Sequence, residues 1–189
     1  MVYLLPKSHT LGTQATCMDA LFDPESLRRQ SGTTFRDEQS VDSTDDFEYF
    51  RSIAGLVAIG IPTEGGQILL MDSPHGWRLP YGPVESGADW TAVARQFGTE
   101  MTGRDIAIDT AERIARIERR LENGNEETTS YEAVLRAAPV EGQPVNPTSA
   151  FGPWNDVEIA WFSSVPDDAY WDHGDAIADI RRCLERGPE

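Results

Sequence analysis

Cysteine and histidine are scarce in this chain of 189 residues, which holds two cysteines and three histidines. The cysteines, Cys17 and Cys183, stand near opposite ends of the chain, and neither has a second Cys or a His beside it at metal-ligand spacing. This usage does not indicate a zinc site or a disulfide framework. Reduced thiols in a cytoplasmic protein are the expected state of both residues.

Long hydrophobic runs are also lacking. No apolar stretch approaches the roughly 18 residues that a membrane-spanning helix needs, so no membrane span is expected. The first ten residues, MVYLLPKSHT, hold a short apolar patch without a basic segment before it, which is atypical of a secretory signal peptide. The sequence therefore favours a cytoplasmic protein that does not enter a membrane.

Positive charge is in short supply. Asp and Glu total 32 against 16 Lys and Arg, the net charge is -16, and Lys7 is the only lysine. Such an acidic surface repels nucleic-acid phosphates, so duplex binding is not expected. An acidic partner surface and adaptation to high internal salt both explain the bias. Because the acids are spread along the whole chain, we favour a halophilic, salt-adapted protein, in which charge repulsion is screened within about 3 Å at molar salt.

The N-terminal region, residues 1–50, is polar and has an interrupted hydrophobic pattern. Short helices are predicted after an N-cap at Asp23 and after another at Ser43 or Thr44. We interpret this region as an extension that packs on the core of a single domain over residues 51–189. A partly ordered extension is the alternative interpretation.

From residue 54 onward, strand and helix patterns alternate. Turn signals stand at 63–66 and at Asn123-Gly124, and Asp89 and Gly103 have the residue types of a helix N-cap and C-terminal stop. The order of elements predicts an α/β fold with a mixed sheet covered on both faces by helices. The expected elements are a hairpin over residues 55–72, a helix over 89–102, strands over 112–121 and 127–138 joined as a hairpin, a strand over 157–163 and a helix over 175–186.

The predicted helix over 89–102 has two different faces. Helical spacing predicts that Trp90, Val93, Phe97 and Met101 form its buried face. Carboxylates on the opposite, polar stripe of such a helix can hold Mg²⁺ against a diphosphate, as in metal-assisted hydrolysis of phosphoanhydrides. The polar stripe here consists of Ala92, Arg95, Gln96, Thr99 and Glu100.

Residues 76–103 resemble the Nudix box of the Nudix hydrolases, G-x5-E-x7-R-E-U-x-E-E-x-G-U, which usually follows W-x-L-P-G. The matching residues are Trp77, Leu79, Pro80 and Gly82 in the lead-in, and Val84, Glu85 and Gly87 in the turn. The resemblance extends over about residues 54–186. It implies a Nudix-like α/β/α sandwich with a mixed β-sheet, and Mg²⁺-dependent hydrolysis of a nucleoside diphosphate linked to another moiety.

The helix departs from the family pattern, and two registers are open. Counted rigidly from Gly82, the first box Glu falls on Ala88. With a one-residue deletion in the turn, Arg95 meets the box Arg and Phe97 meets the apolar position, and we prefer this register. Both registers leave Glu100 on one of the paired glutamates and lose the other helix acids.

The resemblance implies a site for this chain. Glu100 is the expected catalytic residue and principal ligand of Mg²⁺, or of Mn²⁺, with Glu85 as a second metal ligand and Arg95 orienting the helix glutamate through an ion pair. The basic cluster on the later hairpin is expected to clamp phosphates, although ion pairs with the abundant acids explain it equally well. Expected substrate-binding residues are Arg113, Arg116, Tyr81 and Gly82.

Two functions follow from these residues. The first is a Nudix-type hydrolase, in which Glu126, Glu127 or Glu132 of the later hairpin could supply a further acid. The second is a catalytically silent Nudix-like module that binds a nucleotide or an ADP-ribose-type ligand for regulation. The matching lead-in residues favour a functional pocket, whereas the glutamates missing from the box favour a protein without catalytic activity. Either way, the expected partner is a small nucleotide-type molecule.

Overall fold

The computed structural model describes residues 17–141, 157–169 and 174–185. Its larger sheet contains β1 (Thr34–Asp42), β2 (Gly55–Gly60), β4 (Tyr81–Val84), β5 (Ile108–Leu121) and β6 (Glu127–Ala137). The strands lie in the order β1-β5-β6-β2-β4. The pairs β1–β5 and β2–β6 are parallel, whereas β5–β6 and β2–β4 are antiparallel. A smaller antiparallel sheet pairs β3 (Ile68–Met71) with β7 (Ile159–Phe162).

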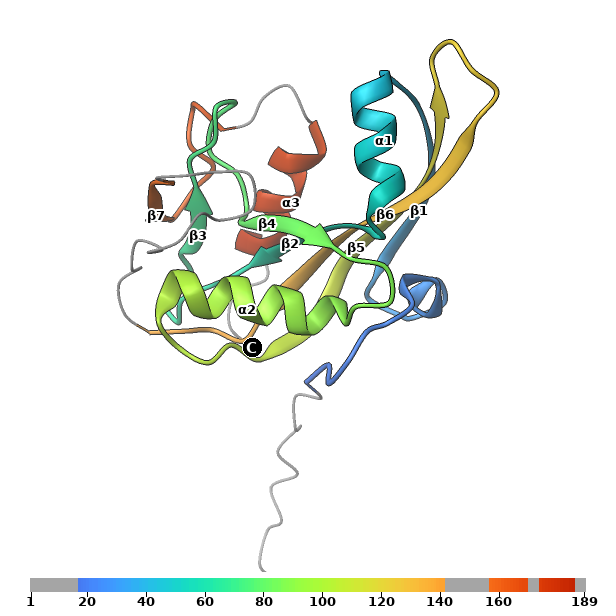
Figure 1. The fold of residues 1–189 in the computed structure, drawn as a ribbon. Helices are drawn as coiled ribbons and strands as arrows, with labels where there is room; N and C mark the ends of the chain where they lie inside the picture. The colour runs from blue at the N-terminus through green and yellow to red at the C-terminus, as the bar shows by residue number, and fades with distance from the viewer. Residues whose placement is uncertain (1–16, 142–156, 170–173, 186–189) are drawn as a thin grey trace, which may run out of the picture.

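Helices cover both faces of the larger sheet (Figure 1). They are the short 3₁₀ helix η1 (Pro24–Leu27) and the α-helices α1 (Thr44–Ser52), α2 (Trp90–Thr102) and α3 (Gly174–Glu185). Strand alternation separates two cores, because successive side chains point to opposite faces. Val57 and Ala133 belong to the core under α2, whereas Ala58 and Val134 belong to the smaller core under α3. The predicted α/β fold with a mixed sheet is confirmed.

The hairpin predicted over residues 55–72 forms only at its tip, where Pro62 pairs antiparallel with Ile68 and the Leu69 amide donates to the Ile61 carbonyl at 3.0 Å. The turn at 63–66 does form, with the Thr63 amide donating to the Gln67 carbonyl at 2.8 Å. Beyond it β2 enters the larger sheet and β3 the smaller one. Both edges of β2 are already occupied, by β6 and β4, so β3 must pair elsewhere and takes β7.

The later hairpin is confirmed, with Asn123-Gly124 in the connection between β5 and β6. β5 begins at Ile108, four residues before the predicted start at 112, and two register shifts lie in its first part. Such irregularities interrupt the alternation of buried and exposed residues, so this alternation does not predict where the strand begins. The result is one long strand pair at the centre of the sheet.

The helix α2 begins after the predicted N-cap, Asp89, whose carboxylate accepts the Thr91 amide at 3.0 Å. It ends at Gly103, which has the left-handed conformation, φ 67°. Trp90 and Met101 are fully buried as predicted, but Val93 and Phe97 are half-buried. The buried stripe is rotated towards Ala94 and Gly98, since Gly98 has no side chain and Ile106 packs closely against its backbone.

The N-terminal region contains a strand that the sequence analysis did not predict. Both predicted short helices are confirmed, with Asp23 and Ser43 as N-caps. Between them, β1 pairs parallel to β5 as the edge strand of the larger sheet. Its residues, TFRDEQSVD, are mostly polar and partly exposed. The sequence therefore lacks the hydrophobic alternation that predicts a strand. A division of the chain at residue 50 stays a prediction.

The C-terminal elements agree with expectation. The predicted strand over 157–163 is β7, and the predicted helix is α3, in which Ile180 is fully buried and Ile177 and Leu184 pack partly buried against the same core. Most of the Pro/Gly-rich loop over 139–155 lies outside the described residues. No helix in the described part of the chain is long and apolar enough to cross a membrane.

Candidate functional site

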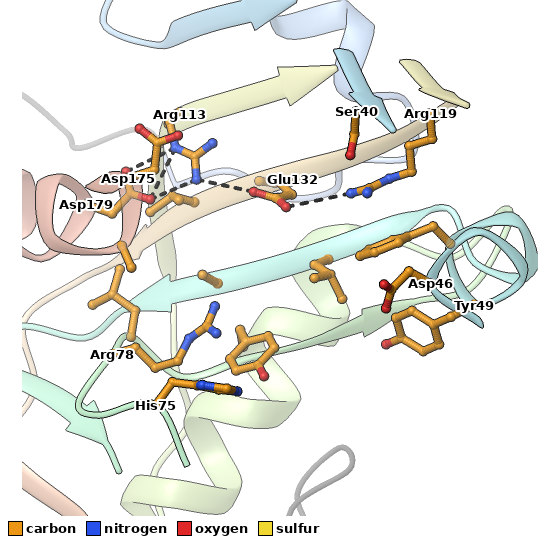
Figure 2. A pocket seen from close by; sticks show the side chains of 18 of the residues that line it. Ser40, Asp46, Tyr49, His75, Arg78, Arg113, Arg119, Glu132, Asp175 and Asp179 are labelled. Atoms are coloured by element: carbon orange, nitrogen blue, oxygen red, sulfur yellow. Dashed lines mark hydrogen bonds and ion pairs between the residues drawn. The ribbon is translucent and has the colours of Figure 1, made fainter. Parts of the chain in front are cut away.

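A cleft of about 630 Å³ lies on the face of the larger sheet that carries α1 and α3 (Figure 2). Its floor comes from the sheet, its two ends from the two helices and one wall from the segment that leads into β4. The charged residues that line it are Asp42, Asp46, Arg78, Arg113, Arg119, Glu132, Asp175 and Asp179. With five carboxylates against three guanidinium groups, the lining is formally two charges negative.

Two arginines of β5, Arg113 and Arg119, lie on the cleft floor. Arg113 donates to Asp179 of α3, with Nη2 2.8 Å from Oδ2 and Nε 3.1 Å from Oδ1. Burial opposes its charged form, but the hydrogen bond and charge of Asp179 outweigh burial and raise the pKa of Arg113. Arg119 donates to Asp42 of β1 at 3.1 Å and to Ser130 at 2.7 Å. Both guanidinium groups are therefore fixed in place.

Aromatic rings lie beside these cations. The guanidinium of Arg119 lies 3.4 Å from the ring centroid of Phe50, and that of Arg78 lies 3.6 Å from the ring centroid of Tyr81. Tyr49 of α1 is 43% exposed and packs edge-on against Phe50, with ring centroids 5.2 Å apart. A guanidinium group and a ring therefore lie together at two places in the cleft, an arrangement suited to a ligand with both an aromatic ring and an anionic group.

The predicted substrate-binding residues separate into two groups. Arg113 and Tyr81 line the cleft. Arg116 projects from the opposite face of β5, where it pairs with Glu118 at 2.7 Å and with Glu25 at 3.6 Å. Arg116 lies three positions after Arg113 on β5. Because successive side chains of a strand point to opposite faces, the two cannot share a face. The two arginines therefore do not lie on one face of β5, and substrate binding by either stays a prediction.

Gly82 is a packing position between β4 and α2. A Cβ atom placed on it would lie 2.1 Å from Cζ of Phe97. Gly82 is buried and does not line the cleft. The absence of a side chain thus lets the Phe97 ring pack against the β4 backbone.

The polar stripe of α2 makes other contacts than those expected. Arg95 donates to the Met18 carbonyl at 3.0 Å and also to the Asp19 carbonyl. The ion pair expected between Arg95 and Glu100 is not among the ion pairs of the described residues. Glu100 instead accepts from Nε2 of Gln96 at 3.0 Å. Neither Arg95 nor Glu100 lines the cleft.

Glu85 is exposed and lies with Gln96 at a shallow depression of about 300 Å³ beside α2. The expected metal ligands Glu85 and Glu100 are therefore both neighbours of Gln96. Within residues 17–141, 157–169 and 174–185, no group of three or more His, Cys, Asp and Glu side chains is arranged to hold a metal ion.

The donor set on α2 does not fit the family's helix-borne metal site. Mg²⁺ in such sites usually takes one or two carboxylates in addition to water and phosphate oxygens. Glu100 is the single carboxylate on the stripe, where the family has several, and its neighbours are the neutral Gln96 and Thr99. We therefore derive no chemical step through a metal on α2.

Of the other cleft residues, Arg119 belongs to the basic cluster expected to clamp phosphates, whereas Tyr49 and Asp179 are not among the expected site residues. Arg119 stands an even number of positions after Arg113, so strand alternation alone could have placed the two on one face. Glu132 was considered only as a possible hairpin acid. Tyr49 and Asp179 come from α1 and α3, and no sequence signal links these helices to the same cleft.

Similar proteins were found only among solved structures: no family model and no curated protein matches the chain. The Escherichia coli dihydroneopterin triphosphate pyrophosphohydrolase is 16% identical, with a TM-score of 0.48 over 72% of this chain and 96% of that one. A Bacillus subtilis pyrophosphohydrolase is 13% identical, with a TM-score of 0.41 over 72% of this chain and 84% of that one. Neither likeness identifies a substrate or a site residue here.

Proposed function

We propose that this chain is a Nudix-like protein that binds a nucleotide-type small molecule in the cleft between α1 and α3. The observation that carries the proposal is the combination of fixed guanidinium groups and aromatic rings along one cleft. A guanidinium group binds phosphate oxygens through two parallel donors, and a ring stacks on a nucleobase. The cleft volume lies within the roughly 300–1,000 Å³ of small-molecule sites.

Binding without hydrolysis is the better-supported form of this function. The helix that would carry the metal has one carboxylate on its polar stripe, and its arginine is engaged with main-chain carbonyls. The cleft, by contrast, has its cations and rings already in place. A regulatory module that recognises a nucleotide or an ADP-ribose-type ligand needs only the cleft.

Hydrolysis of a pyrophosphate bond, in a ligand bound at the depression beside α2, is the second candidate. It is favoured by the family lead-in and by the position of Glu85 and Glu100, which both neighbour Gln96 on α2. If this activity exists with Mg²⁺ or Mn²⁺, Glu100 is the residue on which it must depend.

One set of titrations tests both candidates. ADP and ADP-ribose are titrated into the protein by calorimetry, at the lowest KCl concentration that keeps it folded, and phosphate release is followed with and without Mg²⁺. We expect binding without turnover. Tyr49→Ala should weaken binding by about 5- to 100-fold through lost stacking, whereas Phe22→Ala, an exposed ring outside the cleft, should leave it unchanged.

Glu100→Gln separates the two candidates. It removes the charge of the stripe carboxylate but keeps its shape, so we expect unchanged ligand binding and an unchanged melting temperature. Mg²⁺-dependent turnover that falls about 10²- to 10³-fold in Glu100→Gln would establish the hydrolase instead. No binding of either ligand by the wild-type protein would refute the proposed function.

A further inference from the structure

The floor of the cleft carries a row of alternating charges, in the order Asp179, Arg113, Glu132, Arg119 (Figure 2). The row ends at Asp42, which pairs with Arg119. The outer contacts are hydrogen bonds, 2.8 Å between Arg113 and Asp179 and 3.1 Å between Arg119 and Asp42. The inner contacts are longer, with the Glu132 oxygens 3.7 Å from Nη2 of Arg113 and 4.0 Å from Nη2 of Arg119. These distances exceed hydrogen-bond range. Glu132 is thus attracted by both arginines but hydrogen-bonded to neither.

Exposure separates Glu132 from the rest of the row. The side chains of the two arginines and of the two outer aspartates are 5–7% exposed, whereas that of Glu132 is 31% exposed. A ligand in the cleft can therefore reach Glu132, and Glu132 has solvent into which it can turn. The two arginines would keep their outer partners if it did so.

Arg113 has unused donor capacity. Its Nε and Nη2 atoms donate to Asp179, but Nη1 is buried and has no hydrogen-bond partner. Most buried donors in proteins are satisfied, so a buried guanidinium nitrogen without an acceptor indicates a missing group. The missing group must be an acceptor, because every guanidinium nitrogen is a donor.

We propose that Glu132 occupies the position that a phosphate group of the ligand takes between Arg113 and Arg119. The phosphate enters as the Glu132 carboxylate turns out towards solvent, and its extra oxygens supply the acceptor that Arg113 lacks. This inference rests on the proposed function and adds to it a residue that sets ligand affinity. A tetrahedral phosphate has more acceptor oxygens than a carboxylate, so it satisfies two facing guanidinium groups better.

The neighbouring rings define the rest of the ligand. Phe50 lies under the Arg119 guanidinium, and Tyr49 packs against Phe50 at the same end of the cleft. A phosphate between the two arginines therefore lies next to an aromatic wall. The expected ligand is a nucleotide whose phosphate binds the arginines and whose base contacts this wall, so ADP should bind more tightly than inorganic pyrophosphate.

The test is the affinity for ADP without magnesium in wild type, Glu132→Gln and Glu64→Gln, measured by calorimetry at one low KCl concentration. Glu132→Gln removes the competing charge, and we expect ADP to bind at least about tenfold more tightly. Glu64→Gln removes one negative charge from an exposed turn outside the cleft, and should change the affinity by less than about twofold. Thermal melting checks that each variant is folded.

Further variants distinguish competition by the Glu132 charge from a structural role of the Glu132 side chain. Glu132→Ala should also tighten ADP binding, whereas a merely structural Glu132 would lose affinity on truncation. Adding Arg119→Gln to Glu132→Gln should abolish the gain, because the bridging pair is then broken.

Each possible outcome either supports or overturns the role of Glu132. Equal or weaker Mg²⁺-free binding by Glu132→Gln, with wild type binding ADP, overturns the role of Glu132 and leaves the proposed function standing. If a second titration with Mg²⁺ shows that Glu132→Gln loses only the Mg²⁺-dependent part of ADP binding, the role is also overturned, because Glu132 would then carry the cation. If no protein in the set binds ADP, the role of Glu132 is wrong, and the ADP-ribose titration then decides the proposed function. Binding by Glu132→Gln alone supports the inference.

Discussion

At the scale of single residues, Arg95 shows how one guanidinium group can join two distant segments. It reaches from α2 to the carbonyls of Met18 and Asp19. The same segment is held by Asp89, whose carboxylate accepts the Leu21 amide at 2.9 Å. Burial acts to raise the pKa of Asp89, but the amide donors of Leu21 and Thr91 outweigh it and lower that pKa. Both side chains position the N-terminal segment along the start of α2.

We predict that Arg95→Met lowers the free energy of unfolding by about 1–2 kcal/mol, because two main-chain carbonyls lose a charged donor. Denaturant unfolding at fixed KCl measures the change. The exposed Arg29→Met serves as the matched control and should stay within about 0.5 kcal/mol of wild type. An Arg95→Met protein with wild-type stability and lost turnover would assign Arg95 to catalysis instead.

At the scale of elements, the contact between β4 and α2 depends on a glycine. Gly82 has the residue type of the family lead-in, and its position is explained by packing, since the Phe97 ring occupies the space of a side chain there. β4 then leads through a short turn to the N-cap of α2. The glycine therefore controls how closely the strand and the helix approach.

We predict that Gly82→Ala lowers the free energy of unfolding by about 1–3 kcal/mol through overpacking against Phe97. Denaturant unfolding gives the value. Gly65→Ala is the control, because a Cβ there meets no atom closer than 3.6 Å. Gly82→Ala combined with Phe97→Ala should cost less than the sum of the two single changes; a strictly additive pair would contradict direct contact.

At the scale of the whole molecule, the excess of negative charge is the main electrostatic feature that affects stability. The chain carries a net charge of -16, and about half of its arginines form ion pairs within the described residues, such as Arg28 with Asp37 and Arg51 with Glu126. Exposed pairs of this kind contribute roughly 0–1 kcal/mol each. The remaining carboxylates repel one another, and this repulsion opposes the compact state.

We predict that the melting temperature rises as KCl increases from low to molar concentration, because salt screens this repulsion more than it weakens the exposed ion pairs. Differential scanning calorimetry over a KCl series measures the trend. A melting temperature that is constant or falls over the range would contradict salt adaptation and would favour the acidic surface as a site for a partner.

The local elements could be predicted from the sequence because their signals act over a few residues. Side-chain caps at Asp23, Ser43 and Asp89 bond amides two or three positions away, and Gly103 adopts a conformation that disfavours other residues. The Asn123-Gly124 turn joins neighbouring strands in the same way. The α/β class and the ends of α2 followed from such signals, and the scarcity of carboxylates on the polar stripe of α2 was visible in the sequence.

Only the tertiary structure decided which segments share a sheet and which side chains share a cleft. β1, with little hydrophobic pattern, entered the sheet because β5 had a free edge, and β3 was excluded from it because β2 had none. Arg113 and Arg119 met Asp179, Glu132 and Asp42 through pairings between strands and helices far apart in the chain. Such contacts depend on competition among all the segments for edges and faces, and this competition is settled only when the whole chain packs.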